Sequence, residues 1–576
     1  MRRGWCAGVL VAAGAATLLA GCDGRATAPP SRDATPSAVS EAVDVPPAAC
    51  PQPPPPAASP APSTPPGLTP DPLAEPPAAG APSPPARGEA LLEAAARRVA
   101  AAAAVRRALP AFDQLVASAV ARSGVPGSAV AVIAGDTVMY ERCSGVREVG
   151  RSDSVGPHTL FPLGAVSRAY TTTLLAVLVG EGELRWDQPV RTVWLGFRLR
   201  DRWASSETTF RDLTAGRSGL PAQAGMELRR FGYGRAEILR RLRHLDPVAG
   251  FRTESASQDA LVTAAAVAAA RATGVSWERM VRERLLAPLG DRDTVVTRGG
   301  LLRSRDRVAP HRCEAGSMLA GRPPDESVFA PSLGVAASLR GVETFARLIL
   351  NDGAVGGVRV APDGAMAQTL TPAAAVASDG PTLLASSPGW TLSSFDDRLI
   401  ATAEGGLESG TGAVVTLVPD DGVAVIVLAN ASPHGVWLGR ALARTLIDLA
   451  VVGIPREDWV SREQAAAAPG ERSRGLTLPP LPPAAAPPPR PRGACLGTYA
   501  DRYYGEVRVG RAPGGGLAIR LGRGETLHYM PWSADVWREA VSGTAAVFDV
   551  RAGRARGVTL TLLSFDGRRG FFARVD

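Results

Sequence analysis

The stretch LFPLGAVSRAYTTTLLAVLVGEGELRWDQPV, which runs from Leu160 to Val190, carries the most specific pattern in the chain. It combines a tight turn at Gly164, a start made of small residues and a long apolar run. This order predicts a helix that begins near Ala165 and buries most of its surface. The side chains of the first helical turn therefore decide which chemistry this part of the molecule can support.

Two strand pairs are predicted on either side of a largely helical region. The segment SAVAVIAGDTVMYERCSGVREVG (128–150) alternates apolar and polar residues around Gly135-Asp136. The segment AVVTLVPDDGVAVIVLANA (413–431) repeats this design around Pro419-Asp420-Asp421-Gly422. Such patterns predict hairpins. Strands at both ends of a domain, with helices between them, predict one antiparallel sheet that closes late in the chain.

Composition divides the chain into five segments. Residues 1–22 have the basic start and apolar run of an export signal. Residues 23–88 are rich in Pro, Ala and Ser and predict an extended, disordered tether. Residues 89–462 are expected to form the main α/β (α+β) domain, and residues 463–494 a Pro-rich linker. Residues 495–576 alternate short strands with glycine turns and predict a small antiparallel all-β domain.

Three helical segments are predicted from apolar spacing and charge. An Ala-rich helix is expected from Glu89 to Arg107, and a separate amphipathic helix in AFDQLVASAVARSG (111–124). The segment from Arg229 to Asp246 is interpreted as an amphipathic helix with a solvated arginine face.

The charge and cysteine content exclude several classes of function. All 63 basic residues are arginine, the net charge is +8, and the aromatic residues that usually accompany nucleic-acid sites make up only 5%. We interpret the arginine excess as compositional bias and expect no nucleic-acid partner. The six cysteines and five histidines show no metal-ligand spacing, so neither a metal nor another cofactor is expected. The pairing of Cys143, Cys313 and Cys495 stays open.

The end of the export signal, LAGC, resembles a bacterial lipobox. This resemblance implies cleavage before Cys22, lipidation of its sulfur and attachment to a membrane. Asp23, which follows, implies retention at the inner membrane where the rule known from enteric bacteria applies. We therefore expect a periplasm-facing lipoprotein of the cell envelope. An ordinary secretory signal with a chance cysteine is the alternative.

A series of collinear motifs resembles the β-lactamase-related serine hydrolases, which include class C β-lactamases, D-aminopeptidases and penicillin-binding-protein-like enzymes. The motifs are VPGSAVAVI, TLFPLGAVSRAYTTTLLAVLVGEGELRWDQPV, TTFRDLTAGRSGLP, PSLGVAASLRGVETFARLILNDG and EGGLESGTGAVVTLVPDDGVAVIVLANA. The resemblance extends from about Phe112 to the C-terminus, where LGTYADRYYGEVRVG is similar to the small β domain appended to such proteins. It implies a β-lactamase/transpeptidase-like domain, in which helices and a helical subdomain flank an antiparallel sheet.

The same resemblance implies that the catalytic positions are substituted. The family's serine nucleophile and the lysine base three residues later correspond to Ala165 and Arg168. A methyl group cannot attack a carbonyl, and a guanidinium group stays protonated and has no acceptor. The Tyr-x-Asn element corresponds to Ser257-Gln258-Asp259, and the Lys/His-small-Gly element to Glu404-Gly405-Gly406. Substitution at three separate elements predicts an inactive site.

Ser167 is not expected to replace the nucleophile. It lies two residues beyond Ala165, about 200° around the helix, and is interpreted as a solvent-facing or capping serine. Arg168 is a permanent cation, whereas Asp259 and Glu404 are anions. We therefore expect Arg168 to form a bridge to Asp259, to Glu404 or to both, because an unpaired buried arginine is strongly unfavourable. Side chains that are merely tolerated after loss of activity are the alternative.

Three functions remain open. The first is a catalytically inactive, lipid-anchored protein that binds a peptidoglycan peptide or an envelope protein. The second is an active serine hydrolase, such as an esterase, D-aminopeptidase or β-lactamase-like enzyme, with a non-standard nucleophile. The third is a structural lipoprotein that works through its C-terminal β domain.

Overall fold

The computed structural model describes residues 87–576, except residues 315, 377–383, 407–409, 467–476 and 565–569. The predicted export signal, the lipidation site at Cys22 and almost all of the predicted tether therefore lie outside the described residues. Cys143 and Cys495 are free thiols, whereas Cys313 is disulfide-bonded.

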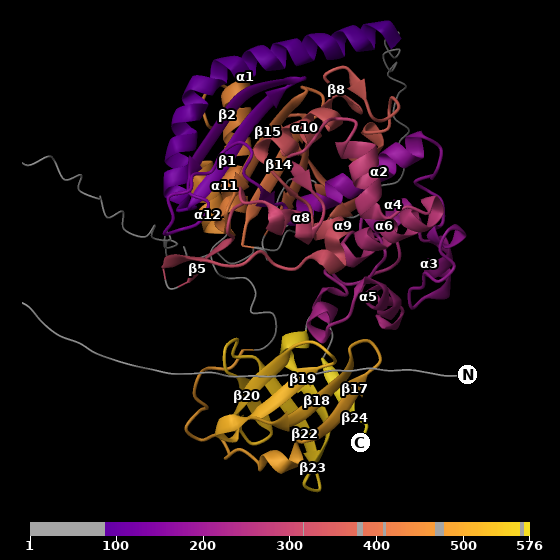
Figure 1. Cartoon of the computed structure of the whole chain (residues 1–576), viewed down its shortest axis with the longest axis vertical. Helices are drawn as coiled ribbons and strands as arrows, with labels where there is room; N and C mark the ends of the chain where they lie inside the picture. Colours follow the sequence, from indigo (N-terminus) through magenta and orange to yellow (C-terminus); the bar gives the residue numbers. More distant parts are fainter. Residues whose placement is uncertain (1–86, 315, 377–383, 407–409, 467–476, 565–569) are drawn as a thin grey trace, which may run out of the picture. The chain divides into compact units, whose positions relative to one another are not determined.

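One eight-stranded antiparallel sheet organises the main domain (Figure 1), in the order β10-β11-β12-β13-β14-β15-β1-β2. Both predicted hairpins are present, and β1 pairs with β15 from Ser128 opposite Ala429 to Ala134 opposite Val423. The predicted late closure of the sheet is thus confirmed. The strands are β1 (Gly127–Ala134), β2 (Thr137–Gly145), β10 (Ala374–Val376), β11 (Leu384–Ser387), β12 (Trp390–Phe395), β13 (Arg398–Gly405), β14 (Gly412–Val418) and β15 (Val423–Ala429).

Helices cover both faces of this sheet. The inner face packs against α2 (Ser167–Gly180) and α10 (Leu339–Leu350). The outer face packs against α1 (Arg87–Ser123), α11 (His434–Val451) and α12 (Trp459–Ala466), as Figure 1 shows. Every residue of β1, β14 and β15 is buried, which explains why these strands are almost entirely apolar.

The N-terminal helix corrects one prediction. The two helices expected on either side of Pro110 are a single helix, α1. Val105, Phe112 and Val116 are all buried in the same cluster against the sheet. These apolar residues keep helical spacing across Pro110, so burial of one continuous stripe outweighs the hydrogen bond that the proline removes.

The helical subdomain corrects a second prediction. The segment from Arg229 to Asp246 is not one helix, because the backbone at Gly232 is left-handed, with a φ of 74°. It contains the 3₁₀-helix Met226–Phe231, α5 (Arg235–Arg241) and the 3₁₀-helix Leu242–His244. Its arginines are also not simply solvated: Arg229 pairs with Glu326 at 2.5 Å, and Arg241 pairs with Glu237 at 2.7 Å.

The remaining elements of the main domain are short. The helices are α3 (Arg202–Glu207), α4 (Phe210–Thr214), α6 (Asp259–Thr273), α7 (Trp277–Met280), α8 (Arg298–Arg303) and α9 (Ala330–Leu333). The strands are β3 (Phe161–Pro162), β4 (Thr294–Val295), β5 (His311–Glu314), β6 (Ser317–Ala320), β7 (Ala336–Ala337), β8 (Ala354–Val355), β9 (Val358–Arg359) and β16 (Ala431–Ser432). No single helix of the described residues is long and apolar enough to cross a membrane, and only the bent pair of α6 with residues 277–286 reaches that length and composition.

The C-terminal domain is a closed antiparallel β-barrel of strands β17 to β24 in sequence order. Tyr499, Tyr529 and Phe572 fill its interior. The described end of the Pro-rich linker lies along the barrel, since Leu478 N donates to Gly543 O and Ala534 N donates to Pro487 O. The strands are β17 (Gly497–Asp501), β18 (Gly505–Arg511), β19 (Leu517–Leu521), β20 (Thr526–Ser533), β21 (Val536–Glu539), β22 (Ala545–Arg551), β23 (Arg554–Leu560) and β24 (Phe571–Arg574).

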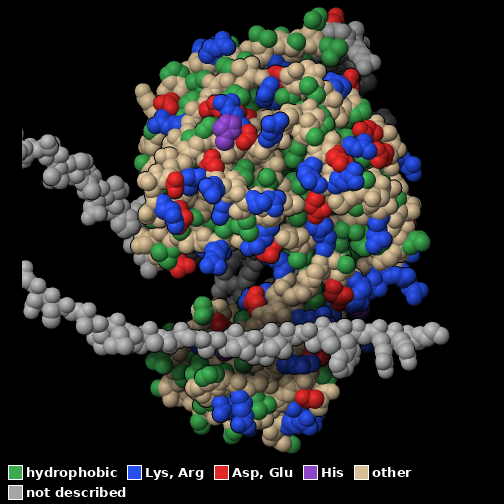
Figure 2. Space-filling view, in the orientation of Figure 1, with side chains coloured by type: hydrophobic (Ala, Val, Ile, Leu, Met, Phe, Trp, Pro, Cys, Tyr) green, Lys and Arg blue, Asp and Glu red, His purple; other side chains and the backbone are tan. Residues whose placement is uncertain are grey.

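Arginine and acidic side chains are intermixed on the face of the main domain shown in Figure 2. Ion pairs of the main domain include Arg147–Asp306 at 3.0 Å and Arg340–Glu141 at 2.8 Å. The arginine excess is therefore largely compensated locally on this face rather than gathered into one basic surface.

A buried carboxylic acid lies in the first turns of α10. The side chain of Glu343 is 3% exposed. Arg340 pairs with both Glu343, at 3.4 Å, and Glu141 of β2, at 2.8 Å. Burial, followed by the hydrogen bond with Glu141, raises the pKa of Glu343 to about 8. At neutral pH the folded protein therefore holds a proton that the unfolded chain has released.

This proton makes stability depend on pH. We expect the free energy of unfolding to be highest below about pH 4.5 with respect to this group and to fall between pH 4.5 and about 8. Urea unfolding across this range measures the slope, and Glu343→Gln should flatten it, whereas the exposed control Glu254→Gln should not. An unchanged slope in Glu343→Gln contradicts the assignment.

Candidate functional site

The start of α2 is held against the end of β13 by direct contact between their backbones. A Cβ atom on Gly164 would lie 2.2 Å from the backbone nitrogen of Gly406, and one on Gly405 would lie 2.4 Å from that of Ala165. No side chain fits at either position. Glycine at these positions therefore allows the turn that carries Ala165 to lie directly beside the strand that carries Glu404.

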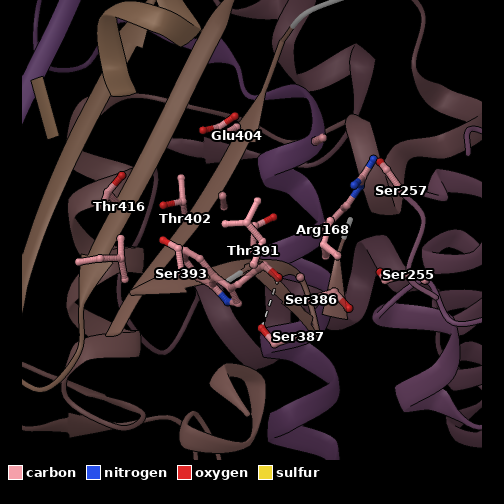
Figure 3. A pocket seen from close by; sticks show the side chains of 18 of the residues that line it. Arg168, Ser255, Ser257, Ser386, Ser387, Thr391, Ser393, Thr402, Glu404 and Thr416 are labelled. Carbon is pink, nitrogen blue, oxygen red and sulfur yellow. Dashed lines mark hydrogen bonds between the residues drawn. The ribbon is translucent and has the colours of Figure 1, made fainter. Parts of the chain in front are cut away.

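A pocket of about 670 Å³ opens at this junction. Four of the five sequence-predicted positions line it, namely Ala165, Arg168, Ser257 and Glu404. Figure 3 shows Arg168 and Ser257 at one end of the pocket and Glu404 on the strand that borders it. The fifth position, Asp259, is buried as the first residue of α6 and contacts Arg168.

Arg168 and Asp259 form a partly buried ion pair. Arg168 donates from Nε and Nη2 to Asp259 Oδ1 at 2.8 and 2.6 Å, and the side chains are 21% and 6% exposed. The N-terminus of α6 also stabilises the carboxylate. The predicted bridge to Asp259 is thus present.

The predicted alternative, a bridge from Arg168 to Glu404, is not formed. Glu404 pairs instead with Arg440 of α11, with Nε to Oε1 at 2.7 Å and Nη2 to Oε2 at 2.5 Å. Strand geometry explains this partner, because Glu404 lies opposite Val414 on the outer face of the sheet, next to α11. The hydrogen bonds with Glu404 raise the pKa of Arg440 above its usual range.

Two polar residues near the turn have structural roles. Ser167 is fully buried, where its hydroxyl donates to Gly164 O at 2.6 Å and accepts from Val335 N at 3.0 Å. The interpretation of Ser167 as a solvent-facing or capping serine is therefore wrong, whereas the expectation that it points away from the site agrees with its absence from the pocket lining. Gln258 is also buried and accepts a hydrogen bond from the Ser218 hydroxyl at 2.8 Å.

The residues that line the pocket offer no pairing of a nucleophile with a base. None of the five histidines lines it, and burial lowers the pKa of both His311 and His434. Ser257 lies near Arg168, but a guanidinium group cannot accept its proton (Figure 3). No three His, Cys, Asp or Glu side chains in the described part of the chain are placed to hold a metal ion.

Sequence reasoning missed a second group of pocket residues. Arg440 and Arg444 of α11, Glu463 of α12 and hydroxyl side chains of β11 to β14 line the same cavity. Burial raises the pKa of Glu463, and its carboxylate lies 3.8 Å from Arg440. Alternation in TLSSF (391–395) and IATAE (400–404) is the signal that could have located the hydroxyl face.

Comparison with known proteins identifies the family. The family model described as Beta-lactamase matches residues 112–449, which is more than half of the chain. The chain belongs to the β-lactamase family.

Curated relatives and a solved structure agree with this assignment. An unguisins hydrolase of Aspergillus campestris is 25% identical over 426 residues, covering 69% of this chain and 77% of the relative. Penicillin-binding protein 4 of Amycolatopsis lactamdurans is 27% identical over 349 residues, covering 58% and 87%. The octameric penicillin-binding protein homologue from Pyrococcus abyssi shares the fold at a TM-score of 0.55, with 17% identity and coverage of 81% and 99%.

Removing one member of the buried ion pair should destabilise this β-lactamase-family protein strongly. Arg168→Met leaves the Asp259 carboxylate buried without its partner and should cost about 3–5 kcal/mol of unfolding free energy. The double variant Arg168→Met/Asp259→Asn should recover most of this loss, because no unpaired charge remains. Chemical denaturation of the four proteins in the cycle measures the coupling.

The exposed pair Arg279–Glu283 serves as the control, since Arg279→Met should cost about 0–1 kcal/mol. A loss this small for Arg168→Met as well would contradict a tightly coupled pair.

Proposed function

We propose that this protein is a non-hydrolytic member of the β-lactamase family that binds a ligand in the cell envelope. The ion pair between Arg168 and Asp259 carries this proposal. It joins Arg168, at the position expected for the general base, to Asp259, which belongs to the element expected to relay the proton. Both groups are thereby committed to each other, and Ala165 supplies no nucleophile.

The shape of the site supports binding without reaction. The cavity of about 670 Å³ is within the size range of small-molecule sites and is not filled by the substituted side chains. The two glycine contacts that position the start of α2 are retained although the reactive groups are absent. The frame of an acyl-transfer site therefore persists around a pocket that can hold a ligand.

The cellular setting is part of the proposal. The lipobox-like LAGC, with Cys22 as the lipidated residue, supports an anchor in the inner membrane, and the Pro-rich segment 23–88 supports a domain held at a distance from it. In this setting, a fragment of peptidoglycan or an envelope protein is the expected partner.

A second candidate is a serine hydrolase with a shifted nucleophile. Ser255, Ser257 and Ser393 line the pocket, and one relative carries the name of a hydrolase. This candidate requires a base that accepts a proton from one of these hydroxyls. The Asp259 and Glu404 carboxylates are already engaged by arginines, which disfavours it.

Intact mass after incubation with a penicillin and, separately, with a fluorophosphonate separates the two candidates. We expect no covalent adduct on the wild-type protein, because the described residues that line the pocket pair no nucleophile with a base. An active relative labelled in parallel shows that the reagents work. A stable mass increase that disappears when a single serine is changed to alanine would establish the hydrolase instead.

A matched variant tests whether only the reactive groups are missing. Ala165→Ser combined with Arg168→Lys and Asp259→Asn restores the residue types of the family at these three positions. We expect slow acylation of this variant, because the backbone frame that orients residue 165 is intact. Trypsin mapping should place the adduct on residue 165.

A further inference from the structure

A row of hydroxyl side chains crosses four neighbouring strands at the far end of the pocket. In the strand register, Thr416 of β14 lies opposite Thr402 of β13, Thr402 lies opposite Thr391 of β12, and Thr391 lies opposite Ser386 of β11. All four residues line the pocket, and Figure 3 shows Thr416 and Thr402 farthest from Arg168, with Thr391 and Ser386 closer to it. We call Ser386, Thr391, Thr402 and Thr416 the hydroxyl row. Neighbouring strands are about 4.8 Å apart, so the row presents hydroxyls at regular intervals.

The hydroxyl row begins where the cover of helices ends. Thr416 lies opposite Val425 of β15, and Val425 lies opposite Val132 of β1. These two valines are buried in the cluster formed with α1 and α11. The line of paired residues that contains the hydroxyl row therefore continues with apolar residues on β15 and β1, beneath the helices, and is polar only where it borders the pocket.

The hydroxyls of the row are available to a ligand. Within the described residues, those of Thr391, Thr402 and Thr416 have no hydrogen-bond partner, and that of Ser386 has only a long contact of 3.4 Å to Ala374 O. Thr416 is nevertheless only 4% exposed. None of the four hydroxyl oxygens is among the buried polar atoms without a partner in the described residues, so they open to the pocket and can exchange water for the hydroxyls of a bound polar molecule.

Apolar side chains adjoin the hydroxyl row, and the charges nearby are compensated. Phe395 of β12 and Ile400 of β13 lie on the same face of the sheet as the row, because residues two or four apart on a strand share a face. Ala443 and Ile447 of α11 also line the pocket. Glu404 is paired with Arg440, and Glu463 lies 3.8–4.0 Å from Arg440 and Arg444. This part of the pocket is therefore amphipathic but has almost no net charge.

We propose that the hydroxyl row and the apolar side chains that adjoin it bind an uncharged oligosaccharide of pyranose units. Pyranose rings present hydroxyls at their edges and C–H groups on their faces, which matches a surface that carries hydroxyls next to apolar side chains. Hydroxyl side chains donate and accept, as sugar hydroxyls do. An anion would meet compensated charges, and an extended peptide cannot add to β13 alongside the row, because β12 and β14 already pair with it there.

This inference deepens the proposed function by naming a ligand class, and it rests on that function because the bound sugar is not cleaved. Two sources share this chemistry: cell-wall glycan with N-acetylated sugars, and a neutral glucan. Chitotetraose and maltotetraose represent them as separate probes.

Isothermal titration calorimetry of a protein that comprises residues 87–576, with each tetrasaccharide in turn, tests the proposal. We expect at least one to bind, and Thr391→Val and Thr402→Val each to weaken binding about 2- to 10-fold, since each removes a hydroxyl at nearly constant shape. Thr391→Ser keeps a hydroxyl and should lose less than Thr391→Val. Thr344→Val, on the exposed side of α10, is the control outside the pocket.

Three results would overturn the inference. They are the absence of binding of either tetrasaccharide at millimolar concentration, valine variants that bind as tightly as wild type, and binding of a peptidoglycan stem tetrapeptide that depends on Thr391 and Thr402. The penicillin and fluorophosphonate labelling stays a separate measurement. An acylated protein that binds sugar contradicts the proposed function alone, whereas an unlabelled protein that binds none contradicts only the ligand class.

Discussion

The pairing of β1 with β15 joins segments about 300 residues apart in the chain, from Ser128 opposite Ala429 to Ala134 opposite Val423. Through this pairing the N-terminal hairpin becomes continuous with β14 and β13, which end at the pocket. It also gives α1 and α11 a common surface on the outer face of the sheet. Since loop closure over such a distance is costly in entropy, the apolar side chains buried on both faces must supply the compensating free energy.

The position of the pocket depends on a second constraint that follows from this sheet. The end of β13 and the turn before α2 approach so closely that neither Gly164 nor Gly405 can carry a side chain without a shift of the backbone. These contacts involve backbone atoms only, so they do not depend on the side chains that residues 165 and 168 carry. Under the proposed function, the site therefore keeps its geometry without a nucleophile and a base.

Electrostatic compensation explains how the substituted site tolerates buried charge. Arg168 is matched by Asp259, and Glu404 is matched by Arg440. The Asp259 carboxylate is buried, so its pair with Arg168 adds little stability over an apolar replacement, but removal of Arg168 is expensive. The Glu404–Arg440 pair is more exposed and contributes less, but it fixes the direction in which the Glu404 side chain points. The two pairs leave the hydroxyl row as the uncharged, unpartnered polar surface of the pocket.

The sequence alone determined the two hairpins, the late closure of the sheet, the β domain at the C-terminus and the presence of Ala165 and Arg168 in the motif at the start of the buried helix. These features depend on the alternation of neighbouring residues, or on the identity of a residue within a motif, and both are local. The tertiary structure decided that Ser167 is buried, that α1 continues through Pro110 and that Glu404 faces Arg440 rather than Arg168. It also aligned Ser386, Thr391, Thr402 and Thr416 in one row. The physical reason is that the register between strands and the helix that covers each face are set by packing between distant segments, which no single stretch of sequence contains.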